Sequence, residues 1–270
     1  MTQALLQGVH RFGNPEGAKL VLLHSSQSNT GQWRALIQAL QNDFDCIGVD
    51  LLGYGSAPKA DLAKGEAFRF EDELTRVVEG VKGLIGTQPI ALVGHSYGGA
   101  LALKMAFEQH LDVRALAMFE PVAFHLLEAD EPARVEIEAI AAQMHQHDAL
   151  AATTAFVDYW NFPGFFAGLP AKMQQLMASQ ASKVALDFAA LMGEPHAPSA
   201  YQQMNLPVLL LTGSHTQQSA KRVAVQLLQV LPKVDHQQLD CGHMGPLTHP
   251  QLVNPLLIAF LHQHKDALRV

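Results

Sequence analysis

Short apolar runs bounded by Gly, Pro or Asp alternate along this chain with longer stretches whose apolar residues recur at helical spacing. Apolar runs of this length are typical of strands buried on both faces, and their alternation with helices indicates a parallel sheet covered on both sides. The predicted strands are 20–24, 46–50, 90–94, 115–119, 208–212 and 236–239, and the predicted helices are 30–41, 68–85, 97–109, 218–230 and 250–264. The sequence therefore predicts an α/β fold with a mostly parallel central sheet flanked by helices.

The alternation stops between Pro121 and Pro207, where the pattern is helical. Helices are predicted there over 131–147, 148–160 and 169–192. A segment of this length between two strands is too long for a loop, so we expect an inserted helical cap over 122–200. The core is then formed by 1–121 and 201–270 as one large domain.

Charge and composition exclude several classes of partner. The formal net charge of -7 gives no electrostatic reason to expect nucleic acid or an anionic membrane as a partner. The N-terminal segment lacks a basic stretch followed by a long apolar core, and no run reaches the roughly 18 apolar residues of a membrane helix. We therefore expect a cytoplasmic protein, with Cys46 and Cys241 reduced and buried.

Metal binding is not indicated by the histidines. The pairs His145/His147 and His262/His264 have a spacing of two, and such residues do not share a face of a helix. Nothing in the chain requires a metal or an organic cofactor.

The segment IALVGHSYGGALAL (90–103) combines an apolar strand, a Gly-x-Ser-x-Gly turn and a helix rich in Ala and Leu. Small residues around so tight a turn let the helix approach the strand, and the turn lifts the hydroxyl of Ser96 to the carboxyl edge of the sheet. The backbone N–H of Tyr97 then lies at a helix N-terminus, where it is aimed at a developing oxyanion. Ser96 is thus the candidate nucleophile.

In this context the sequence resembles the α/β-hydrolase superfamily from about residue 18 to the C-terminus. The segment LVLLHSSQSNTGQW (20–33) resembles the first oxyanion loop of that family, with Ser25 where Gly is common, and by position the second oxyanion N–H is that of Ser26. His24 is expected to be a structural hydrogen-bonding residue behind this loop. The segment VDLLGYGSA (49–57) is similar to the family's Asp-x-x-Gly-x-Gly turn, which implies a structural role for Asp50.

The segment LDCGHMGPLTHP (239–250) follows the last predicted strand and resembles the loop that carries the catalytic histidine of the family. The resemblance implies that His243 is the general base, in the chain order nucleophile, acid, base.

The acid departs from the usual pattern of the family, in which an Asp follows the strand read here as 208–212. That spacing falls on Thr216, which carries no charge. Some lipases and haloalkane dehalogenases carry the acid after the preceding strand, and here ALAMFEPVAF (115–124) places Glu120 there. A buried, unpaired Glu would be costly to desolvate, whereas one that accepts from the ring N–H of His243 is satisfied. The alternative is that Glu120 caps the first turn of the cap or pairs with a cationic side chain.

The resemblance implies a cofactor-independent serine hydrolase that cleaves a small ester or related acyl compound through a Ser96–His243–Glu120 triad, such as a carboxylesterase, a thioesterase or a carbon–carbon bond hydrolase. A Ser nucleophile, rather than Asp, disfavours epoxide hydrolase or haloalkane dehalogenase chemistry. Two alternatives stay open. A haloperoxidase-like perhydrolase uses the same triad, and a ligand-binding protein on a hydrolase scaffold is suggested by the residues at 25 and 216.

The richest aromatic stretch of the chain, FVDYWNFPGFF (156–166), lies in the predicted cap. Its Tyr159, Trp160 and Phe162 are the candidate substrate-binding residues and favour a hydrophobic acyl or alcohol group. The alternative is that the same side chains pack the cap on the main domain or form the cap's own core.

Overall fold

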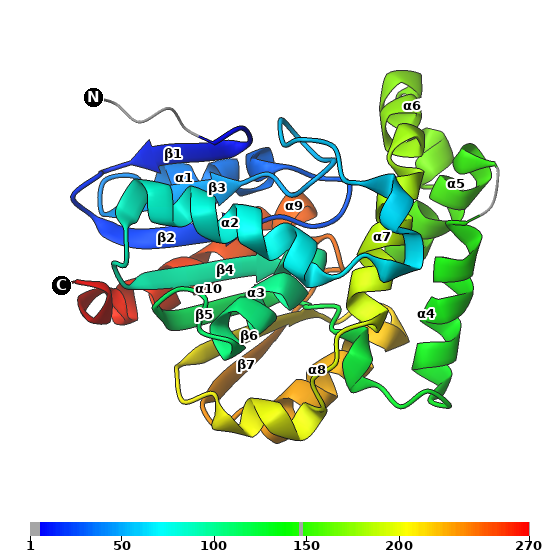
Figure 1. The fold of residues 1–270 in the computed structure, drawn as a ribbon. Helices are drawn as coiled ribbons and strands as arrows, with labels where there is room; N and C mark the ends of the chain where they lie inside the picture. The colour runs from blue at the N-terminus through cyan, green and yellow to red at the C-terminus, as the bar shows by residue number, and fades with distance from the viewer. Residues whose placement is uncertain (1–5, 146–147, 270) are drawn as a thin grey trace.

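A computed structural model describes residues 6–145 and 148–269, and within them the chain forms a seven-stranded sheet of order β1-β3-β2-β4-β5-β6-β7 (Figure 1). The strands are β1 (Val9–Gly13), β2 (Ala18–Leu23), β3 (Phe44–Val49), β4 (Ile90–His95), β5 (Val113–Phe119), β6 (Val208–Gly213) and β7 (Val234–Leu239). Neighbouring strands pair in parallel except β1, which is antiparallel to β3. The predicted mostly parallel sheet is confirmed.

The edge strand β1 was not predicted from the sequence. Its segment VHRFG is short and only its first residue, Val9, is buried, so it lacks the apolar run that marks β2 to β6. Backbone pairing from Val9 with Val49 to Gly13 with Asp45 holds it in the sheet.

Helices cover both faces of the sheet. The described helices are α1 (Arg34–Leu40), α2 (Phe70–Ile85), α3 (Tyr97–Phe107), α4 (Pro132–Gln143), α5 (Ala149–Trp160), α6 (Ala171–Ser179), α7 (Ala181–Met192), α8 (Gln218–Val230), α9 (Gly245–Thr248) and α10 (Pro250–Gln263). The apolar sides of α2, α3 and α8 pack in one core cluster, and those of α1 and α10 pack in the other. Along β2, Val21 and Leu23 face the first cluster while Leu20 and Leu22 face the second. Burial on both faces explains why β2 to β6 are mostly apolar without alternation.

Four helices, α4 to α7, form the segment between β5 and β6 and lie together at one end of the sheet, away from both labelled termini (Figure 1). We call residues 122–200 the helical insertion. The helix predicted over 131–147 ends at Gln143, and 146–147, with His147, lie outside the described residues. The helix predicted over 169–192 is two helices that meet at Gln180. No Pro or Gly marks this break, and α6 and α7 both pack on α5.

Both cysteines are free and buried, as expected. Among the described residues, no helix is both long and apolar enough to cross a membrane.

Candidate active site

The turn between β4 and α3 carries Ser96 with backbone angles of φ 54° and ψ −120°. Such angles are uncommon for a residue other than glycine and mark a strained turn. Two glycines allow the close packing around it. A Cβ on Gly94 would lie 2.4 Å from the carbonyl oxygen of Gly98, and a Cβ on Gly98 would lie 2.4 Å from the carbonyl oxygen of His24. The second contact places the end of β2 directly against the first turn of α3.

The three candidate catalytic side chains meet in one buried chain of hydrogen bonds. Ser96 Oγ lies 2.9 Å from His243 Nε2, and His243 Nδ1 lies 2.6 Å from Glu120 Oε2. Because a carboxylate can only accept, the proton of the neutral imidazole is on Nδ1 and Nε2 is free to accept from the serine. This is the geometry of a nucleophile, a general base and an orienting acid.

The carboxylate of Glu120 also accepts hydrogen bonds from the last residue of β6 and from the loop that follows it. Its Oε1 accepts the N–H of Gly213 at 2.7 Å, and its Oε2 accepts the hydroxyl of Thr216 at 2.7 Å in addition to the imidazole of His243. The Glu120 backbone has a positive φ of 42°, and its N–H donates to the carbonyl of Leu211 in β6. Thr216, the position of the missing Asp, therefore contacts the carboxylate that replaces it. Among the described residues, Glu120 pairs with His243 and not with a lysine or arginine.

Two residues contact His243 in a way that the sequence did not predict. His95, next to Ser96, lies with its Nε2 2.9 Å from the carbonyl oxygen of His243 and so donates to the backbone of the histidine loop. Burial lowers the pKa of His95 well below its ordinary value, so its ring is neutral. The indole of Trp160, from the end of α5, stacks on the imidazole of His243 with ring centroids 3.9 Å apart. Both contacts join residues far apart in the sequence.

The loop after β2 is fixed by His24. Its Nε2 accepts the N–H of Leu51 at 2.9 Å, so its Nδ1 carries the proton and donates to the carbonyl of Ser25 at 2.7 Å. Burial lowers the pKa of His24 to about 4. That carbonyl shares a peptide plane with the N–H of Ser26, which in a trans peptide points the opposite way. The hydroxyl of Ser25, at the usual glycine position, donates to Gln32 Oε1 at 3.0 Å.

The three aromatic residues proposed to bind substrate have different surroundings. Trp160 covers the candidate histidine, as described above. Tyr159 is half-buried, and its hydroxyl lies 2.8 Å from Ser219 Oγ in α8. Phe162 is 60% exposed, with its ring beside that of Phe165. A role for Tyr159 and Phe162 in substrate binding stays a prediction.

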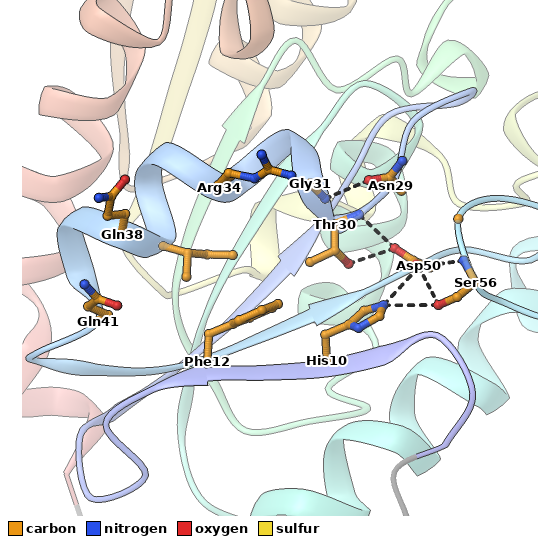
Figure 2. Close-up of a pocket in the computed structure, with 12 residues that line it drawn as sticks. His10, Phe12, Asn29, Thr30, Gly31, Arg34, Gln38, Gln41, Asp50 and Ser56 are labelled. Carbon is orange, nitrogen blue, oxygen red and sulfur yellow. Dashed lines mark hydrogen bonds and ion pairs between the residues drawn. The ribbon is translucent and has the colours of Figure 1, made fainter. Parts of the chain in front are cut away.

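A surface pocket of about 690 Å³ lies elsewhere, between β1, α1 and the turn after β3 (Figure 2). Its His10, Asp50 and Ser56 resemble a triad in composition only. Asp50 Oδ2 and Ser56 Oγ both lie against the same ring atom, His10 Nε2, at 3.0 and 3.3 Å, so no proton relay runs through the ring. Asp50 also accepts the N–H and the hydroxyl of Thr30 at 2.7 and 2.8 Å. These bonds agree with the predicted structural role of Asp50.

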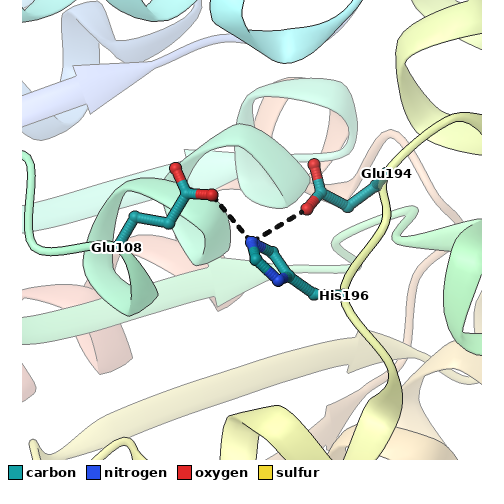
Figure 3. A group of neighbouring side chains, drawn as sticks. All are labelled: Glu108, Glu194 and His196. Atoms are coloured by element: carbon teal, nitrogen blue, oxygen red, sulfur yellow. Dashed lines mark hydrogen bonds and ion pairs between the residues drawn. The ribbon is translucent and has the colours of Figure 1, made fainter.

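A cluster of Glu108, Glu194 and His196 joins the end of α3 to the end of the helical insertion (Figure 3). Lys104 Nζ lies 2.7 Å from Glu108 Oε1 and 3.0 Å from Glu194 Oε2, and His196 Nε2 lies 2.7 Å from Glu108 Oε1. Burial raises the pKa of Glu108, but hydrogen bonds from Lys104, His196 and His110 outweigh it and lower the pKa to about 2. The lysine supplies the positive charge that a metal ion would bring, so this cluster is an ion-pair network.

A family model described as the alpha/beta hydrolase family matches residues 20–256. Among curated proteins, a haloalkane dehalogenase of Agrobacterium fabrum is 31% identical over 114 residues, covering 42% of this chain and 36% of the relative. A cis-3-alkyl-4-alkyloxetan-2-one decarboxylase of Xanthomonas campestris is 30% identical over 118 residues, covering 42% and 39%. The matched segments thus span well under half the length of these relatives.

Solved structures agree over nearly the whole chain. An enol-lactonase from Burkholderia xenovorans superposes with a TM-score of 0.76 at 15% identity, covering 94% of this chain and 95% of the other. A hydrolase from Pseudomonas aeruginosa gives 0.75 at 19% identity, covering 94% and 93%. At these identities the likeness shows the fold, whereas the family model covers most of the sequence. The chain belongs to the alpha/beta hydrolase family.

Proposed function

We propose that the chain is a serine hydrolase that cleaves a small, hydrophobic ester or related acyl compound through an acyl-enzyme. The observation that carries the proposal is the continuous chain of hydrogen bonds from Ser96 Oγ through His243 to Glu120. A ligand-binding protein has no need of a strained, buried serine that is hydrogen-bonded to a histidine in this way. The relatives named above have different chemistries, so the proposed reaction depends on the site rather than on their names.

The proposed mechanism uses side chains of the chain and no cofactor. His243 Nε2 takes the proton of Ser96 as Oγ attacks the acyl carbon, while Glu120 fixes the imidazole tautomer and stabilises the imidazolium. The N–H groups of Tyr97 and Ser26 stabilise the oxyanion. The imidazolium then protonates the leaving group, and a water molecule activated by the same histidine releases the acid product.

A hydrophobic substrate is favoured by the surroundings of His243. The indole of Trp160 covers one face of the imidazole, and its ring stacks with Phe124 in the same apolar cluster. An acyl or leaving group bound beside His243 would therefore contact aromatic surface on this side of the site, which favours a hydrophobic group.

Labelling with a fluorophosphonate tests this proposal. We expect rapid modification of Ser96, located by peptide mass spectrometry, and slow labelling in Glu120→Gln; Ser96→Ala serves as the negative control. Wild-type protein that is folded but forms no adduct on Ser96 would contradict the hydrolase proposal and would favour the ligand-binding alternative.

A further inference from the structure

A cluster of buried charged side chains lies where the helical insertion meets the core. Lys183 and Asp187, one turn apart on α7, form an ion pair, and Lys183 Nζ also lies 2.9 Å from Oε1 of Glu73 in α2. All three are buried, and Glu73 Oε2 accepts the backbone N–H of Leu52 at 3.0 Å. The rest of the contact between α7 and the core is mainly apolar.

The second carboxylate oxygen of Asp187, Oδ2, faces the loop that follows β2. Asp187 Oδ2 accepts the hydroxyl of Ser26 at 2.6 Å and that of Tyr54 at 2.6 Å. The next residue, Gln27, has a positive φ of 55°, and its side-chain amide donates to the carbonyl of Met177 in α6 at 2.9 Å. Two successive residues of one core loop are thus held by the insertion.

The stability of the fold does not by itself explain why these charged residues are buried together. Removing charges from water costs several kcal/mol for each ion, and a buried ion pair often contributes no more than well-packed apolar residues of similar volume. What it gives instead is a fixed geometry, since a short hydrogen bond to a carboxylate is both strong and directional. Here the group fixed by Asp187 is the hydroxyl of Ser26.

We propose that Asp187 is a positioning residue, which sets the direction of the Ser26 N–H through the Ser26 hydroxyl. The inference rests on the proposed function, in which that N–H stabilises the oxyanion. The Ser25–Ser26 peptide is then held on both sides, with His24 bound to its carbonyl and Asp187 bound to the side chain that follows its N–H. The oxyanion hole is therefore fully formed only when α7 is packed against the core, because α7 carries Asp187.

The proposal is tested by Ser26→Ala, Asp187→Asn and the double variant, with 4-nitrophenyl butyrate as the substrate probe. Removing an oxyanion donor outright costs roughly 10²- to 10³-fold in kcat, so a donor that is present but poorly aimed should cost about 10-fold. We expect each single variant to lose about that factor in kcat with little change in KM, because the loss is confined to the transition state. The kcat of the double variant should be no lower than that of the less active single variant, because both substitutions disrupt the same hydrogen bond between the Ser26 hydroxyl and the Asp187 carboxylate. Ser26→Thr, which keeps a hydroxyl, should recover most of the loss.

Glu194→Gln is the matched control. Glu194 is also a buried carboxylate of the insertion that pairs with a buried lysine, Lys104, but it does not contact the loop of Ser26. We expect this variant to lower the melting temperature and leave kcat unchanged.

The outcomes separate the two proposals. If wild-type protein neither hydrolyses the ester nor reacts with a fluorophosphonate at Ser96, the proposed function fails, and the positioning role fails with it. If wild-type protein is active but Ser26→Ala matches it, or Asp187→Asn lowers only the melting temperature as Glu194→Gln does, the positioning role alone is wrong. Should Asp187→Asn not fold, Ser26→Ala and Ser26→Thr decide the question, because they leave the ion pairs intact.

Discussion

Replacing Glu120 by Gln changes one carboxylate oxygen to an amide nitrogen and removes the negative charge, with almost no change in volume. In the native site that carboxylate accepts from three donors: the N–H of Gly213, the hydroxyl of Thr216 and the Nδ1–H of His243. A glutamine offers one acceptor oxygen and two N–H donors, so it cannot satisfy all three as they stand.

Both orientations of the glutamine are unfavourable for catalysis. If its oxygen faces Gly213, its amide nitrogen faces His243, which must then accept at Nδ1 and carry its proton on Nε2. That tautomer cannot take the proton of Ser96. If its oxygen faces His243 instead, two N–H groups oppose each other at Gly213, at a cost of about 1–3 kcal/mol for the unsatisfied buried donor, and the imidazolium still has no counter-charge.

The expected loss is large. The same change of acid to amide in a serine protease triad lowers kcat by roughly 10⁴-fold, or about 5 kcal/mol of transition-state stabilisation. We expect a loss of the same order in kcat for 4-nitrophenyl butyrate and in the rate of fluorophosphonate labelling. Circular dichroism should show an intact fold.

Thr216→Val is the matched control, because it removes one hydrogen bond to the carboxylate and leaves its charge. A single hydrogen bond to a charged group is worth about 1.5–3 kcal/mol, or roughly 10- to 150-fold in rate. We expect a loss of about 10-fold in kcat, because most of this energy is lost from the stability of the fold and not from the transition state alone. A Glu120→Gln variant that keeps activity within 10-fold of wild type would show that Glu120 is not the acid, and the reasoning from its three donors would be refuted.

Three further predictions concern Thr216 and Trp160 in the candidate site and Glu108 in the ion-pair network. Thr216→Asp should lower the melting temperature and not raise turnover, because it adds a second carboxylate beside the oxygen of Glu120 that Thr216 now contacts; a clear gain in kcat would mean that the wild-type site lacks an acid. Trp160→Leu should lower kcat about 5-fold, since the imidazolium of His243 loses a cation–π contact worth about 1 kcal/mol, and unchanged kinetics would exclude such a contribution. Burial raises the pKa of Glu108, but hydrogen bonds from Lys104, His196 and His110 outweigh it and hold this pKa at about 2, below its ordinary 4.5. The contribution of Glu108 to stability is therefore present above pH 4.5 and is lost as the pH falls toward 2. Unfolding monitored by circular dichroism across that window should be less pH-dependent in Glu108→Gln, and identical acid unfolding of the two proteins would contradict this.

The parallel strands and the flanking helices were predictable because their signals are local. A strand buried on both faces is mostly apolar, and β2 to β6 are, apart from a charged residue at the second position of three of them, Lys19, Asp45 and Arg114. The edge strand β1 escaped prediction because it pairs only with β3 and its side chains after Val9 are half-buried or exposed, so they form no apolar run. The break at Gln180 escaped for a related reason, since it accompanies packing on α5 and not a helix-breaking residue.

The candidate site was predictable to the extent that motifs fix it. The turn at Ser96 and the loop at His243 each have a short signature, and Glu120 followed from the absence of a carboxylate at 216. The contacts of His95 with the backbone of His243 and of Asp187 with Ser26 span 148 and 161 positions. Contacts at such separations depend on how α3, α7 and the loops pack, and no local pattern records them.

The two departures at positions 120 and 216 are complementary, and the sheet explains why. Strands β5 and β6 are parallel neighbours in register, with Phe119 opposite Leu211, so their carboxyl ends meet at the same edge. A carboxylate at the end of either strand therefore reaches the same Nδ1 of His243. With Glu120 there, an acid at 216 would be a second buried negative charge, whereas a hydroxyl is a donor that the carboxylate can use. An acid at 120 together with an acid at 216 would place two carboxylates beside His243, and the absence of both would leave none. The combination of Glu120 and Thr216 leaves one carboxylate, and the hydroxyl of Thr216 donates a hydrogen bond to it.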